Sequence, residues 1–193
     1  MKRPYPFSAA ALLLALTAPC LRANISISAP TLGNISVGTL VNVPIKLTNV
    51  TDLYTWKFNL SFNPAVLQLV SIHQEPLLSG NSRATVVFFP GVINNTLGTV
   101  TFTSATLVGS VPGVSNNGHA ASYQFRVVGT GTSPLDLSSV VLLDPNRTGI
   151  PTNVNDGGVA ATPEPSIPRW AMGIAVIGLI LIQRRIAARK RAA

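Results

Sequence analysis

The sequence predicts an all-β domain of two packed sheets, spanning residues 24–161. Apolar and polar residues alternate along 41–48 and again along 54–62, which is the period of a strand with one buried face. No apolar spacing near 3.6 residues recurs within 24–161, and Asn, Pro and Gly residues separate the apolar runs. Many short strands with one apolar face each favour a sandwich over a single open sheet.

The first two expected strands flank a turn at 49–53. Their apolar residues are Val41, Val43, Ile45 and Leu47 in the first strand, and Tyr54, Trp56, Phe58, Leu60 and Phe62 in the second. Asn63-Pro64 ends the second strand, because Pro64 has no amide proton to give to a sheet ladder. Pro44 indicates that the first strand lies at the edge of its sheet.

Six further strands complete the predicted sandwich. The last of them follows Asp156-Gly157, which is interpreted as a tight turn. The six expected strands are 66–72, 84–89, 98–106, 122–128, 135–143 and 158–161.

Three segments together resemble a known family. They are Val-Pro-Ile-Lys-Leu-Thr-Asn-Val at 43–50, Trp-Lys-Phe-Asn-Leu-Ser-Phe-Asn-Pro-Ala-Val-Leu at 56–67, and Tyr-Gln-Phe-Arg-Val at 123–127. This order, with an aromatic strand ending in Phe-Asn-Pro, resembles the cohesin domain over nearly all of 24–161, although Asn63 stands where an aspartate is common. The resemblance implies a jelly-roll β-sandwich that binds a dockerin-bearing protein through one sheet face. It also implies kinship with carbohydrate-binding modules, so a polysaccharide is a second expected ligand.

The charge distribution argues against nucleic-acid binding. The formal net charge is +8, but three of these charges lie up to residue 22 and five lie beyond residue 162. Between the two ends, five Lys and Arg residues are balanced by five Asp and Glu residues. A neutral middle domain lacks the basic surface that phosphate backbones require.

Residues 1–23 have the three-part layout of a secretory signal peptide. Lys2 and Arg3 precede an apolar run at 7–16, and a polar region follows. Cleavage is expected after Ala23, with lipidation of Cys20 as the alternative. Cys20 is the only cysteine, so the exported domain is expected to contain no disulfide.

Residues 170–193 are predicted to form a transmembrane helix with a basic tail. The run from Trp170 to Ile182 contains no charge and is followed by Arg184, Arg185 and three further basic residues. As a helix it would be about 20 Å long, shorter than the roughly 30 Å hydrocarbon core, and the arginine stems can snorkel to make up part of the difference. The basic tail is expected in the cytoplasm, with the domain outside.

Residues 162–169 form a linker that contains Pro163, Glu164, Pro165 and Ser166. Pro-Glu-Pro, a short apolar helix and a terminal Arg cluster together resemble a PEP-CTERM sorting signal. Ile167, Pro168 and Arg169 between motif and helix depart from the family pattern. The resemblance implies processing by an exosortase, an integral-membrane cysteine transpeptidase, and an anchor that is temporary. The expected location is the cell envelope or the extracellular space.

Neither a catalytic site nor a cofactor is expected. Two histidines, His73 and His119, could join Glu75 and Asp144 in a metal site only if the fold gathered them, and surface positions are favoured for both. Residues 153–158 resemble a calcium loop that lacks its twelfth-position glutamate, and no metal is predicted there.

The predicted function is therefore that of an exported, non-catalytic binding or structural module. Tyr54 and Trp56 could offer a sugar-stacking platform, but their alternation favours the core. Two alternatives remain open at this stage. One is an enzyme of polysaccharide metabolism with dispersed carboxylates, and the other is a permanently membrane-anchored surface protein.

Overall fold

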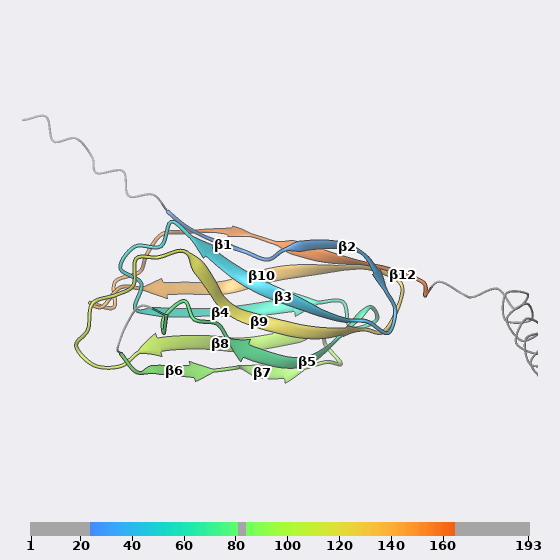
Figure 1. Ribbon diagram of the computed structural model, residues 1–193, viewed down its shortest axis with the longest axis horizontal. Helices are drawn as coiled ribbons and strands as arrows, with labels where there is room; N and C mark the ends of the chain where they lie inside the picture. The colour runs from blue at the N-terminus through green and yellow to red at the C-terminus, as the bar shows by residue number, and fades with distance from the viewer. Residues whose placement is uncertain (1–23, 81–83, 165–193) are drawn as a thin grey trace, which may run out of the picture.

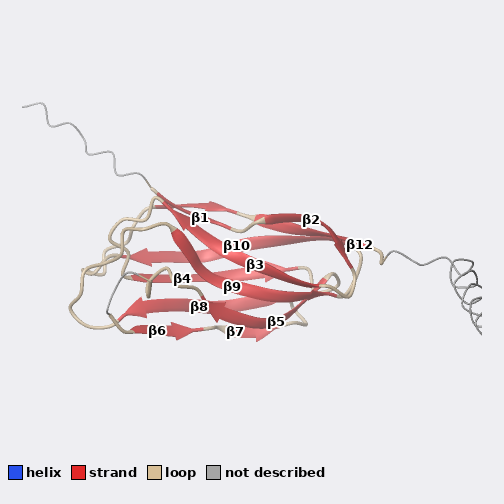
Figure 2. Cartoon of the chain, in the orientation of Figure 1, coloured by secondary structure: helices blue, strands red, loops and turns tan. Residues whose placement is uncertain are grey.

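The computed structural model describes residues 24–80 and 84–164, which contain twelve strands and no helix (Figures 1 and 2). All eight strands expected from the sequence are present. In chain order the strands are β1 (Ile25–Ser28), β2 (Thr31–Ser36), β3 (Leu40–Thr48), β4 (Thr55–Phe62), β5 (Leu67–Gln74), β6 (Val86–Phe89), β7 (Val92–Asn94), β8 (Thr99–Leu107), β9 (Gly118–Val127), β10 (Gly131–Leu143), β11 (Thr152–Asn155) and β12 (Gly157–Thr162).

The strands form two facing sheets, which confirms the all-β sandwich. One sheet has five strands in the order β11-β1-β3-β9-β5. The other has seven, in the order β2-β12-β10-β4-β8-β6, with β7 also paired to β8. In Figure 1 the five-stranded sheet lies in front of the strands β10, β4 and β8.

The first two strands of the sandwich, β1 and β2, lie in different sheets, and so do the last two, β11 and β12. β1 pairs in parallel with β11 in the five-stranded sheet, and β2 then pairs in parallel with β12 in the seven-stranded sheet. The tight turn expected at Asp156-Gly157 is therefore wrong, because Asp156 bridges the two sheets. Its Oδ1 accepts a 2.8 Å hydrogen bond from the Leu137 amide. A side chain at position 157 would collide with the Pro30 carbonyl, 2.3 Å from the ideal Cβ, so Gly157 permits this close crossing.

The edge position expected for β3 is also wrong, since β3 lies between β1 and β9. The physical reason is that β1 is short and pairs only with residues 46–48 of β3. Pro44 lies beyond this pairing and has a neighbour on the β9 side alone, opposite Ser122. An inner strand thus tolerates a proline where one of its two neighbours has ended.

The Asn63-Pro64 turn lies where the sequence predicts it. The Asn63 side chain caps the turn by accepting a 3.0 Å hydrogen bond from the Ala65 amide. The Asn63 amide donates to the Ser133 hydroxyl over 2.9 Å, which ties the end of β4 to β10. The Phe-Asn-Pro segment thus joins the end of β4 to β10.

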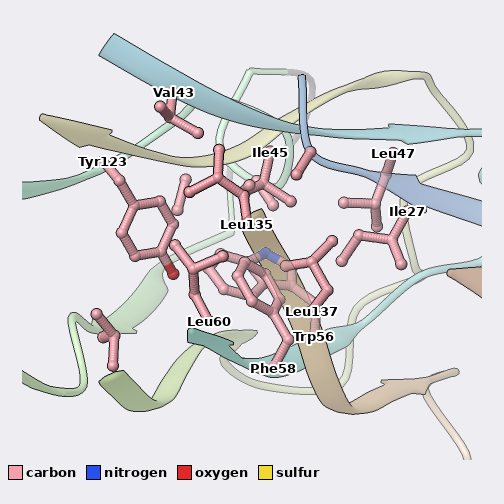
Figure 3. Packing of buried hydrophobic residues seen from close by; sticks show 14 of the residues in the cluster. Ile27, Val43, Ile45, Leu47, Trp56, Phe58, Leu60, Tyr123, Leu135 and Leu137 are labelled. Carbon is pink, nitrogen blue, oxygen red and sulfur yellow. The ribbon is translucent and has the colours of Figure 1, made fainter. Parts of the chain in front are cut away.

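The core fills the space between the sheets, as Figure 3 shows for its central residues. Trp56 and Phe58 come from the seven-stranded sheet, and their rings stack with centroids 5.2 Å apart. Tyr123 comes from the five-stranded sheet, and its ring centroid lies 6.4 Å from that of Phe58. Burial of each such side chain stabilises the fold by about 2 kcal/mol, which lets the domain hold together without a disulfide.

The Tyr123 hydroxyl lies inside this core without a hydrogen-bond partner. The neighbouring Thr103 hydroxyl donates instead to the Pro90 carbonyl, 3.1 Å away. Burial raises the pKa of Tyr123 far above its ordinary value, and the nearby Thr103 hydroxyl lowers it only in part.

A prediction on pH follows for Tyr123. Above pH 10 the phenol ionises in the unfolded chain but stays neutral in the folded one, so the stability should fall as the pH rises, by about 1.4 kcal/mol per unit. Tyr123→Phe should stay within about 1 kcal/mol of wild type at pH 7 and lack this slope. Urea unfolding at pH 7, 10 and 11 measures both. Equal slopes for the two proteins would contradict the assignment.

The predicted export and anchoring segments lie outside the described residues. These are the signal peptide at 1–23, with Cys20, and the C-terminal Pro165, Ser166, Trp170, Ile182, Arg184 and Arg185. Within 24–80 and 84–164, no helix is long and apolar enough to span a membrane. Pro163 and Glu164 are described, and the Glu164 carboxylate lies against Gly38 at the end of the sandwich.

Candidate docking face

Large apolar side chains are exposed on the outer face of the seven-stranded sheet. They come from β8, from β6 and β7, which both pair with β8, and from β10, which β4 separates from β8. Phe102 is 55% exposed and Phe89 is 50% exposed, although phenylalanine side chains are usually buried in the core. We call this surface the outer apolar face, and it comprises Val87, Phe89, Val92, Phe102 and Val141.

Strand register brings several of these residues into one row. Phe89 pairs with Ser104, Ser104 with Lys57, and Lys57 with Val141, across β6, β8, β4 and β10. Directly opposite residues of antiparallel strands lie on the same side of a sheet, so all four side chains point outward. A second row, in which Val87 pairs with Thr106 and Thr106 with Thr55, lies beside the first. The face is therefore a surface of apolar and hydroxyl groups.

Two β-bulges flank β4 at the middle of this face. The pairing of β4 with β8 shifts between Phe58 and Leu60, and its pairing with β10 shifts between Ser138 and Val141. One residue in each bulge adopts a left-handed backbone conformation, with φ of 62° at Phe102 and 51° at Ser139. Such bulges redirect side chains, and here the bulge in β8 places Phe102 on the outside.

The Phe102 conformation is strained and is held from the neighbouring strand. A bulky residue at positive φ costs about 1–2 kcal/mol. The Phe102 amide donates a 2.8 Å hydrogen bond to Oδ1 of Asn59 in β4. The Lys57 ammonium lies over the Phe102 ring, 5.4 Å from its centroid. Strain that persists around an exposed aromatic side chain is typical of a functional surface.

The outer face of the five-stranded sheet differs in character. Register places Arg126 between Leu40 and Gln68, and Gln124 between Asn42 and Ser71. Leu40 and Val70 are exposed there, but no aromatic side chain is exposed on its five strands. This polar face lacks a continuous apolar patch.

The structure does not gather the residues considered for metal binding or catalysis. His73 shares a 2.9 Å hydrogen bond with Ser71 on β5. His119 lies on β9, opposite Lys46. Asp144 accepts the amide protons of Asn146 and Thr148 in a turn after β10. Within the described residues, no three His, Cys, Asp or Glu side chains come together as a metal site would require.

The sugar platform considered for Tyr54 and Trp56 is not available. Trp56 is 1% exposed and belongs to the core, as the alternation predicts. The Tyr54 hydroxyl donates a 2.7 Å hydrogen bond to the Gly109 carbonyl. The sequence prediction missed Phe89 and Phe102 as functional candidates, and it placed Phe102 only as part of an ordinary strand.

A β-sandwich that exposes a row of large apolar side chains on one outer face is typical of a binding module. The family model of the cohesin domain matches residues 25–161, and the chain belongs to the cohesin family. Cohesin domains are non-catalytic, which confirms the prediction that the domain is not an enzyme. It also removes the alternative of a polysaccharide-metabolising enzyme.

Solved cohesin structures share the fold at low sequence identity. A non-cellulosomal cohesin from Archaeoglobus fulgidus is 19% identical, with a TM-score of 0.57, and the match covers 72% of this chain and 92% of that one. The OlpA cohesin of Clostridium thermocellum, in complex with Doc918, is 14% identical with a TM-score of 0.59, covering 72% and 100%. The sixth scaffoldin B cohesin of Acetivibrio cellulolyticus, in complex with the Cel5 dockerin, is 16% identical with a TM-score of 0.57, covering 72% and 100%. No curated protein matches the chain.

Proposed function

We propose that this chain is an exported cohesin module that binds a dockerin-bearing protein through the outer apolar face. The observation that carries the proposal is Phe102, an exposed aromatic side chain in a strained bulge held by Asn59. Aromatic side chains at the centre of an interface commonly supply most of the binding energy. Two of the similar solved cohesins were crystallised with dockerins, which supports this class of partner.

Sorting of a displayed library tests this proposal. Yeast cells displaying a pool of dockerin modules are sorted against the full-length chain in detergent micelles, with cellulose and chitin as competing insoluble ligands. We expect at least one dockerin to bind the wild-type chain and to be lost on Phe102→Ala. Lys46→Ala, on the opposite sheet, serves as the control and should bind like wild type. Binding to glycan alone, or dockerin binding that survives Phe102→Ala, contradicts the proposal.

We further propose that the two ends of the chain deliver the module to the cell envelope or the extracellular space. The signal peptide at 1–23 directs export, and the segment at 170–193 holds the chain in the membrane. The Pro-Glu-Pro motif that begins at Pro163 then marks it for an exosortase. The charge pattern supports this proposal. The domain at 24–161 is formally neutral, and the segments on either side of it each combine an apolar run with basic residues.

Fractionation in matched bacterial strains, with and without an exosortase, tests this route. The full-length chain should remain in the membrane fraction of the strain without the enzyme. In the strain with the enzyme it should appear as a shortened product outside the membrane. A chain ending at Arg169 should leave the membrane in both strains. Membrane retention of the full-length chain in both strains would instead identify a permanent anchor.

A further inference from the structure

Lys57 is the only Lys or Arg on the described strands of the seven-stranded sheet, and it lies at the centre of the outer apolar face. In strand register it lies between Ser104 and Val141, and Phe89 is the next residue along the same row. Its ammonium lies over the Phe102 ring. Within the described residues, Lys57 forms neither an ion pair nor a hydrogen bond through its ammonium group. Three donor protons are therefore left to solvent in the free protein.

The strands of the seven-stranded sheet carry one carboxylate, and it lies too far from Lys57 to neutralise this charge. The only other charged residue on these strands is Asp136. Asp136 pairs with Ser61, four residues from Lys57 along β4, and this spacing corresponds to about 13 Å. The side-chain oxygen Oδ1 of Asn59, two residues from Lys57 on the same face of β4, already accepts the Phe102 amide proton. The positive charge of Lys57 is thus uncompensated within its own sheet.

A partner that covers Phe89, Phe102 and Val141 must also cover Lys57, because Lys57 lies between them. Removal of an ammonium group from water is strongly unfavourable unless an opposite charge replaces the lost hydration. Lys57 is half-buried and its ammonium lies over the Phe102 ring, so the side chain has little freedom to turn out of a tight contact.

From this we infer that the dockerin partner carries a carboxylate which pairs with Lys57, set among aliphatic side chains that pack on Phe89 and Phe102. This inference rests on the proposed function and adds the chemistry of the partner's contact surface. It gives the outer apolar face a selectivity rule, because a dockerin that presents a cation or an unpaired amide at this point is rejected.

The test uses the dockerin recovered by yeast display, with its surface positions randomised. The library is selected in parallel on the full-length wild-type chain and on its Lys57→Met and Lys57→Glu variants, with Lys46→Met as the control. Position 57 points outward and methionine keeps the length of the stem, so both variants should fold. Wild type and Lys46→Met should enrich Asp or Glu at one dockerin position, and Lys57→Glu should enrich Lys or Arg there. Alanine at that position should weaken binding to wild type by about tenfold or more, and to Lys57→Met by less than about twofold.

The outcomes distinguish failure of the proposed carboxylate on the partner from failure of the proposed docking face. Equal selection on wild type and Lys57→Met, with binding still lost on Phe102→Ala, overturns the carboxylate and leaves the docking face standing. Binding unaffected by both Lys57→Met and Phe102→Ala overturns the docking face itself. If no dockerin is recovered on wild type, the proposed function fails and the inference fails with it.

Discussion

Replacement of Phe102 by glycine is expected to weaken dockerin binding by about 30-fold or more while leaving the domain as stable as wild type. The binding loss follows because truncation of a central aromatic anchor costs about 2 kcal/mol or more. The stability should change little, since glycine adopts the left-handed conformation at φ 62° without strain and so gains about 1–2 kcal/mol. Loss of the contact with Lys57 costs about 0.5–1 kcal/mol in return.

Titration calorimetry and thermal unfolding measure the two quantities on the same samples. Val70→Gly, which removes an exposed side chain from the opposite sheet, is the control for binding and should match wild type. If Phe102→Gly unfolds well below wild type, the residue has a structural role. If its binding equals that of wild type, the strained bulge serves no docking function.

Replacement of Gly98 by alanine is expected to destabilise the domain by about 3–5 kcal/mol, among the largest effects of a single methyl group. Gly98 has φ 67°, and an added Cβ would lie 2.1 Å from the Phe62 carbonyl oxygen and 2.7 Å from Cδ of Pro64. These contacts are with backbone and a rigid ring, which cannot move aside. The Gly98 carbonyl also accepts a 2.8 Å hydrogen bond from the Phe62 amide. The melting temperature should fall by about 10 °C or more.

Gly109→Ala is the matched control for this prediction. Gly109 also has positive φ, 93°, but nothing lies within 4 Å of its added Cβ. Only the backbone strain of about 1 kcal/mol should appear, with a fall of a few degrees in melting temperature. Similar melting temperatures for the two variants would show that the collision at Gly98 is relieved by movement of the chain.

The alternation of apolar residues was sufficient to predict the central strands. β3 and β4 each bury one face, so their side-chain pattern reports directly on their geometry. The strands β1, β2, β7 and β11 were not predicted. β2, β7 and β11 expose much of both faces, and β1 is only four residues long. Such strands are defined by their partners, far away in sequence, and carry little local signal.

The docking face could not be predicted, because a bulge reverses the side to which a residue points. Counting by twos from the buried Val100 places Phe102 in the core. The extra residue between the paired positions of β8 turns it outward instead. Lys57 and Asn59 follow the simple alternation and were correctly placed on the outside. Their role depends on Phe102, so the sequence alone assigned them none.

Pro44 and Asp156 illustrate a second limit, which concerns neighbours rather than pattern. A proline lacks one hydrogen bond to a neighbouring strand. The sequence does not show whether that neighbour is missing altogether or only ends before it reaches the proline. An Asp-Gly pair indicates a break between strands, but it is compatible both with a hairpin turn within one sheet and with a connection from one sheet to the other. In each case the tertiary contacts of β1, which ends early, and of β10, which bonds Asp156, decide the outcome.

The most direct test of docking through this face is carbene footprinting of the full-length chain, free and bound to the recovered dockerin, with labelling measured by mass spectrometry. Docking through the outer apolar face predicts protection of peptides that contain Phe89, Phe102 and Val141, with unchanged labelling at Gln68 and Arg126 on the five-stranded sheet. Protection of Gln68 and Arg126, with full labelling of Phe102, would contradict it.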